Sequence, residues 1–148
     1  MIIETINIVA EHVRELVKND AVVVRHYLPF VETETLEAMD KPLIQVFPVN
    51  LQTSNKARNM FSIIYSVDIT ISKKLKERNN TLEKQLAEID PVLNLNETIF
   101  NHFLNTVIID KVICKTPEQL TLVDFKMIET LNVFFVAIRI KAEQILTV

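Results

Sequence analysis

The chain has 148 residues, of which 49% are hydrophobic and 24% charged, and its formal net charge is -3. This length predicts one domain with one core over residues 1–148. The weakly acidic balance gives no electrostatic support for nucleic-acid binding as a main task. The sequence has no glycine, which excludes glycine-dependent phosphate loops, dinucleotide-binding turns and nucleophile elbows.

Neither the single cysteine nor the hydropathy pattern indicates an extracellular or membrane protein. Cys114 has no second cysteine to pair with, and its apolar neighbours predict a buried side chain. No stretch approaches the ~18 apolar residues of a membrane span, and the first residues lack the pattern of a secretion signal. We therefore expect cytoplasmic synthesis and no membrane contact.

The first third of the chain predicts a helix followed by two strands. Apolar residues of the 2–18 segment fall on one helical stripe, and the β-branched 22–27 run favours a strand. An acidic connection at 29–42 leads to a second strand at 43–49. The acidic side chains singled out in this connection are Glu32, Glu34, Glu37 and Asp40.

The middle of the chain predicts a loop and the clearest strand. Residues 50–60 are polar, include Lys56 and Arg58, and read as a mobile loop. Residues 61–72 alternate apolar and polar side chains, so one face of this strand should be buried. A basic group closes the strand and consists of Lys73, Lys74, Lys76 and Arg78.

A second helical region and three strands are expected in the last part. Asn80 with Glu83 resembles a helix start, Asp90-Pro91 should break or restart the helix, and the apolar stripe continues to about residue 105. Strands are predicted at 111–115, 120–129 and 132–141. The order predicts an α+β fold: a mostly antiparallel sheet of five or six strands with the N-terminal helix and the second helical region packed on one face. In the absence of glycine, asparagine should occupy the turns, because it tolerates the left-handed backbone region; the candidates are Asn19, Asn50, Asn55, Asn79, Asn80 and Asn132.

Catalytic and metal chemistry find little support in the sequence. The three histidines, His12, His26 and His102, lack the i, i+4 spacing of a helical metal site, and structural roles are expected for them. Asp68 lies among hydroxyl side chains, but a general acid or base needs a partner that the sequence does not identify. The acidic connection lacks the glycine and spacing of a calcium loop. No cofactor, metal or catalytic residue is predicted, and an enzyme is not expected.

The last strand is apolar on both faces at its centre, where Phe134 and Phe135 follow each other. A strand buried on both sides indicates either a subunit contact or a central position in the sheet. The segments at 29–42 and 50–60 are expected to be binding elements on a rigid frame.

The whole chain resembles the tail terminator (tail completion) proteins of long-tailed bacteriophages, and more broadly small head–tail joining proteins. The segments that carry this resemblance are INIV at 6–9, VVVRHYLP at 22–29, LIQVFP at 43–48, Arg58 in the polar loop, YSVDITI at 65–71 and FFVAIRI at 134–140. The resemblance implies a virion protein of the tail or neck that forms a homo-oligomeric ring, usually of six subunits. Such a ring contacts the tail tube protein and the head connector or stopper protein, ends tube growth and lets DNA pass through its lumen unread.

The charge clusters give this expectation a testable form. The acidic segment should face the lumen or rim, and the basic group, at the other end of the molecule, should face a neighbouring subunit or the next ring, because opposite charges can meet across a ring interface. Reversing Lys73, Lys74 and Lys76 to Glu should then weaken assembly and leave the monomer folded. Two alternatives stay open: a head-side connector or stopper subunit, and a small oligomeric α+β enzyme or ligand-binding domain.

Overall fold

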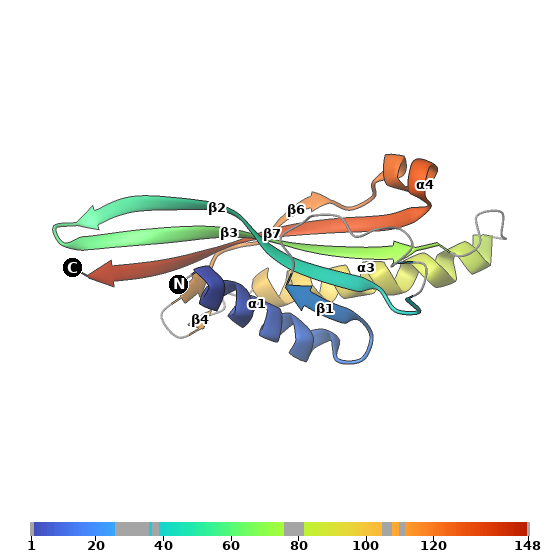
Figure 1. Ribbon diagram of the computed structural model, residues 1–148, viewed down its shortest axis with the longest axis horizontal. Helices are drawn as coiled ribbons and strands as arrows, with labels where there is room; N and C mark the ends of the chain where they lie inside the picture. The colour runs from blue at the N-terminus through green and yellow to red at the C-terminus, as the bar shows by residue number, and fades with distance from the viewer. Residues whose placement is uncertain are drawn as a thin grey trace.

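The computed structural model describes residues 2–25, 36, 39–75, 82–104, 108–109 and 112–147. Helices and strands alternate in groups along the chain (Figure 1). The elements in chain order are α1 (Ile2–Val17), β1 (Val22–Arg25), β2 (Leu43–Ala57), β3 (Met60–Lys74), α3 (Leu82–Leu104), β4 (Ile108–Ile109), β5 (Val112–Cys114), β6 (Glu118–Thr121), α4 (Phe125–Leu131) and β7 (Val133–Thr147). The α+β class is confirmed.

One curled sheet contains every strand of the described residues. Its order is β1-β2-β3-β7-β5-β4, and β6 pairs with β7 beside that path. The β1–β2 pair is parallel and the remaining pairs are antiparallel, as the sequence predicted. In the middle of the sheet Ile69 of β3 lies opposite Val46 of β2 and Ile138 of β7, so side chains of one pleat row share a face.

Both long helices pack on the same face of this sheet, which confirms the predicted layering. The apolar stripe of α1, including Val9 and Val13, joins one buried cluster with Ile99 of α3 and with Ile69 of β3. The contribution of each fully buried aliphatic side chain is about 1.5–3 kcal/mol. Burial of this stripe explains why the 3.6-residue period of α1 and the two-residue period of β3 were readable in the sequence.

The predicted break at Asp90-Pro91 is wrong, because α3 continues through Pro91 from Leu82 to Leu104. Proline removes one backbone hydrogen bond inside a helix and normally kinks it. Here Pro91 lies on the exposed side, while Val92, Leu95 and Ile99 are buried against the sheet. Ile89, before the proline, is partly buried against the same core, so contacts of this face continue across Pro91 and favour a single helix.

The predicted loop at 50–60 is also wrong. Residues up to Ala57 belong to β2, and β3 starts at Met60 after a tight turn. Every side chain from 49 to 57 is exposed, so this strand has no buried face and no apolar alternation. The pairing of β2 with β3 therefore extends well past the helices, and it forms the long projection of Figure 1.

The strand predicted at 120–129 is replaced by two elements. Strand β6 ends at Thr121, and Phe125–Leu131 forms helix α4. Asp124 caps the start of α4 by accepting a hydrogen bond from the Met127 N–H, and Asn132 ends it in the left-handed conformation. These two caps outweigh the β-branched and apolar character of the run between them.

The other predicted strands lie where expected, with different lengths. Strand β1 covers the part of 22–27 that the structure describes, β5 lies within 111–115, and β7 extends the predicted 132–141 strand to Thr147. Positive φ angles occur at Lys18, Asn59 and Asn132. Asparagine at a left-handed position is thus confirmed for Asn132, while Asn50 and Asn55 are strand residues and Asn79 and Asn80 lie outside the described residues. Cys114 is buried, as predicted.

The double-faced apolar run of the last strand follows from the central place of β7. Phe134 belongs to the main core under the helices. On the opposite face, Val133 and Leu43 form a smaller buried cluster with Leu36, against which Met127 of α4 packs. A central strand, rather than a subunit contact, therefore explains the apolar centre of this run.

Candidate functional site

The most distinctive feature of the surface is a projection of β2, β3 and β7 that we call the β-arm, made of residues 49–64 and 141–147. Strand β5 pairs with its base at residues 142–144. It consists of the distal parts of β2 and β3 and the end of β7, which stay paired to the tip: Asn55 lies opposite Phe61, and Phe61 lies opposite Leu146. Figure 1 shows that the β-arm extends beyond the end of α1. Neither long helix covers its distal part.

Several large apolar side chains of the β-arm are exposed. On the face that continues the core, Leu51 is 48% and Phe61 38% exposed. Register places both on the same face as the buried Tyr65. On the other face and near the tip, Ile145 is 43% and Met60 37% exposed. Apolar side chains on both faces of a projecting sheet are typical of surfaces that become buried in an assembly.

The outer edge of β2 is open in the distal half. β1 pairs with β2 over Leu43 to Val46, and from Phe47 onward this edge has no strand partner among the described residues. Pro48, which has no N–H to offer to a ladder, fits an edge strand. Irregularities between Pro48 and Asn50 and between Asn55 and Ala57 bend the edge, a device that limits unspecific strand pairing.

An ionic cluster links strands of the β-arm. The carboxylate of Glu143 on β7 lies 3.3 Å from the ammonium of Lys56 on β2 and 3.1 Å from that of Lys115. Burial would raise the pKa of Glu143, but hydrogen bonds from Lys115 and Lys56 and the charge of Lys115 reverse this effect and lower the pKa. Glu143 therefore stays ionised and ties β2 to β7 across β3.

Asp68, the candidate acid of the sequence, is engaged by an arginine. Arg139 of β7 lies opposite it and donates from Nε and Nη2 to the two carboxylate oxygens, at 2.7 and 3.1 Å. The hydrogen bond to Asp68 raises the pKa of Arg139, and burial lowers it. The charges of Asp68 and Glu118 raise it further, so the net shift is upward. A two-point pair of this kind holds two strands together and leaves Asp68 poorly placed to exchange a proton.

Two of the histidines meet between the long helices. His12 Nδ1 of α1 lies 3.2 Å from His102 Nε2 of α3, and the ring of His102 contacts Phe103 edge-on. Burial, followed by the charge of His12, lowers the pKa of His102, and Glu15 opposes this. A metal centre would need a third ligand, and the described residues hold no group of three or more histidine, cysteine or carboxylate side chains.

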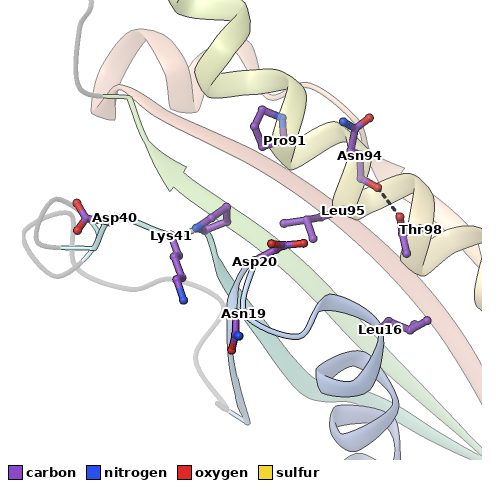
Figure 2. A pocket seen from close by; sticks show the side chains of 10 residues that line it. Leu16, Asn19, Asp20, Asp40, Lys41, Pro91, Asn94, Leu95 and Thr98 are labelled. Carbon is purple, nitrogen blue, oxygen red and sulfur yellow. Dashed lines mark hydrogen bonds between the residues drawn. The ribbon is translucent and has the colours of Figure 1, made fainter.

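An open pocket of about 590 Å³ lies between the end of α1, the start of β2 and the middle of α3. Figure 2 shows its lining side chains. The side chain of Leu95 lies between the helices, whereas the polar ends of Asp40 and Lys41 point in different directions and do not converge on one point. Asp68 and both described histidines are absent from its lining. The arrangement offers a solvent-filled depression without a matched acid and base.

The charged residues singled out by the sequence are only partly brought together. Lys73 is buried, and its ammonium donates to the carbonyl oxygens of Met39 and Asp40 at 3.4 and 2.9 Å. The ammonium of Lys74 donates to the Leu131 carbonyl. Asp40 and this part of the basic group thus lie at the same end of the sheet, so for Asp40, Lys73 and Lys74 the expected placement at opposite ends is wrong.

The remaining predicted site residues have separate positions. Lys56 and Arg58 lie near the tip of the β-arm. Phe134 is 2% exposed and belongs to the core, so its side chain is not presented to a partner, while Phe135 on the other face is half-buried. Glu32, Glu34, Glu37, Lys76 and Arg78 lie outside the described residues. The sequence missed the apolar side chains of the β-arm, whose signal was Leu51 and Phe61 flanking a polar run.

Comparison with known proteins adds no relative. No protein-family model matches the chain, and no curated protein matches it. In the described residues no helix is long and apolar enough to cross a membrane.

Proposed function

We propose that this chain is a structural subunit that assembles with copies of itself through the β-arm, and that the assembly is a ring on the bacteriophage tail tube. The ring would end tube growth, join the tail to the head connector and let DNA pass. This proposal places the protein in the virion, at the tail or neck, and gives it no enzymatic role. The β-arm is the observation that carries it.

The exposed apolar side chains and the open edge of the β-arm support a role in assembly. Exposed apolar side chains and an open strand edge gain little for the isolated subunit and invite aggregation. The ionic cluster at Glu143 links β2 to β7 across β3. Burial of the apolar side chains and pairing of the open edge in an assembly would remove both liabilities.

The rest of the molecule fits a scaffold better than an active site. Asp68 is held by Arg139, and the open pocket lacks converging groups. The net charge of -3 suits a lumen that does not grip phosphates, since positive linings bind DNA strongly and in a salt-dependent manner. The ring geometry and the tail itself come from the resemblance of the sequence.

The mass of the purified protein in solution tests the proposal. Light scattering after size exclusion, followed by electron microscopy of the same fraction, should show a closed ring. The same protein should bind one end of assembled tail tubes. A monomer throughout the micromolar range that leaves tube length unchanged would contradict the proposal. A ring that binds the head connector and ignores the tube would indicate the head-side stopper instead.

The open pocket keeps a small ligand-binding domain as the second candidate. Its volume of about 590 Å³ lies within the range of small-molecule sites. A monomer whose melting temperature rises with a small metabolite, and loses that response on Leu95→Phe substitution, would favour this function over the ring.

A further inference from the structure

A second exposed apolar surface lies away from the β-arm, on the segment 118–131 that contains β6 and α4. We call it the α4 surface. Phe125 is 71% exposed and Leu122 50% exposed, and Leu131 adds to them at the end of the helix. Figure 1 shows α4 toward one end of the elongated molecule and the tip of the β-arm at the other. One subunit therefore carries two different apolar surfaces at its two ends.

The folding of the subunit itself does not account for the α4 surface. No residue of α4 is buried, although the helix has both of its caps. Met127 and Ile128 are half-buried against the sheet, and this contact positions the helix. Phe125, in the first turn of α4, is not part of this contact with the sheet. Aromatic side chains exposed to this degree are enriched at the centres of protein interfaces.

The two surfaces differ in charge. The β-arm carries Lys56, Arg58 and Lys141 against the single carboxylate of Glu143, three positive charges to one negative. The α4 surface carries carboxylates at Glu118, Asp124 and Glu129 against Lys126, three negative charges to one positive. Two β-arms would repel each other, whereas a β-arm and an α4 surface attract each other.

We infer that the β-arm of one copy docks on the α4 surface of the next copy. This inference rests on the proposed function, because it specifies the contact between ring subunits. Contact between two unlike surfaces is head-to-tail, and head-to-tail contacts generate closed rings when the rotation closes and filaments when it does not. The apolar side chains supply most of the affinity, and the charges select the correct partner surface.

Paired substitutions on the two surfaces test the contact. The arm variant carries Leu51→Thr and Phe61→Thr, which keep strand-forming side chains, and the surface variant carries Leu122→Ser and Phe125→Ser. Each variant should weaken self-association at least about tenfold, since interface centres carry most of the binding energy. The matched control is Leu86→Ser, which removes a 43% exposed leucine of α3 outside both surfaces and should assemble like the wild type. Circular dichroism verifies that each variant is folded.

Mixing the two variants distinguishes head-to-tail contact from a contact between like surfaces. The surface variant retains an intact β-arm and the arm variant an intact α4 surface, so a one-to-one mixture should form a dimer and stop there. Sedimentation velocity measures this species. Failure of the mixture to form a dimer, with each variant folded, overturns the inference. So does full assembly by either variant alone.

Cross-linking of wild-type-like subunits gives a second readout that does not depend on weakened variants. Burial raises the pKa of the Cys114 thiol to about 11, so this cysteine stays unreactive toward maleimides near neutral pH. A short bismaleimide should then couple Thr53→Cys subunits to Thr130→Cys subunits, which keep the apolar side chains of both surfaces, and should not couple Thr53→Cys to Leu86→Cys. Equal coupling in both mixtures overturns the inference. If the wild type forms a ring and the variants assemble equally well, the inferred contact is wrong and the proposed function stands. If the wild type is a monomer, the proposed function is wrong as well.

Discussion

The same three strands, β2, β3 and β7, build two regions with different surroundings. In the body of the sheet, Ile44, Ile69 and Ile138 are fully buried beneath α1 and α3. In the β-arm, the same strands continue in register with exposed side chains on both faces. The comparison shows that side-chain burial fixes the strands of the body, while strand pairing that starts in the body carries the β-arm outward.

The largest difference between the two regions should appear in core truncations. Ile69→Ala in the body should lower the free energy of unfolding by about 2–5 kcal/mol, because it removes packed methyl groups and leaves a cavity. Ile145→Ala in the β-arm should change it by less than about 0.5 kcal/mol. Urea unfolding of the monomer measures both. Similar losses at the two positions would mean that the β-arm is part of the folding core.

Substitution of one lysine in each region should give the next largest difference in stability between the body of the sheet and the β-arm. Lys73 at the end of the body bonds two main-chain carbonyls while buried, so Lys73→Ala should cost about 1–3 kcal/mol of stability. Lys56 in the β-arm is 43% exposed at its side chain, and Lys56→Ala should cost less than about 1 kcal/mol. Thermal unfolding at low and moderate salt checks both values.

This contrast corrects the expectation for charge reversal. Lys73→Glu would place a carboxylate beside the carbonyl oxygens of Met39 and Asp40, so it should destabilise the subunit. Arg58→Glu near the tip of the β-arm should leave stability unchanged and slow assembly, most strongly at low salt. If the assembly rates of the wild type and of the Arg58→Glu variant are both independent of salt, the tip charges do not select the partner surface.

The Asp68–Arg139 pair should contribute less than Lys73, because it is partly exposed, at 11% and 31% of the two side chains. A double-mutant cycle with Asp68→Asn and Arg139→Gln should give a coupling of about 1 kcal/mol. If the variants also abolish an activity or a ligand response, Asp68 has a functional role that a cross-strand pair does not explain.

The smallest effect is expected from the histidines of the body. A lowered pKa of His102 means that the unfolded chain binds its proton more readily, so this group favours folding above its ordinary pKa near 6.5 and loses that contribution as the pH falls below it. Stability should therefore decline between pH 7 and pH 5, and His102→Asn should flatten the decline. Since the β-arm contains no histidine, the protection of its amides, relative to the intrinsic exchange rate at each pH, should stay constant over this range.

Elements with a buried face were predictable from the sequence. The stripe of α1, the alternation of β3 and the packing of both long helices on one face follow from apolar periodicity, and all are confirmed. Residues 50–57 carry no such pattern because neither face is buried, and their polar composition favoured a loop. For α4, the caps at Asp124 and Asn132 were present in the sequence, but the apolar run at 120–123 favoured a strand. The ion pairs of Asp68 and Glu143 depend on register across strands far apart in the chain, which single-sequence patterns do not determine.

Hydrogen exchange of the free and the assembled protein tests the central claim most directly. Amides of residues 49–61 on the open edge and at the tip should exchange quickly in the monomer, since few buried contacts protect them. They should become strongly protected on assembly, while amides of α1 and of the buried half of β3 stay unchanged. An assembled ring in which residues 49–61 exchange as fast as in the monomer would contradict the account of the β-arm as the assembly surface.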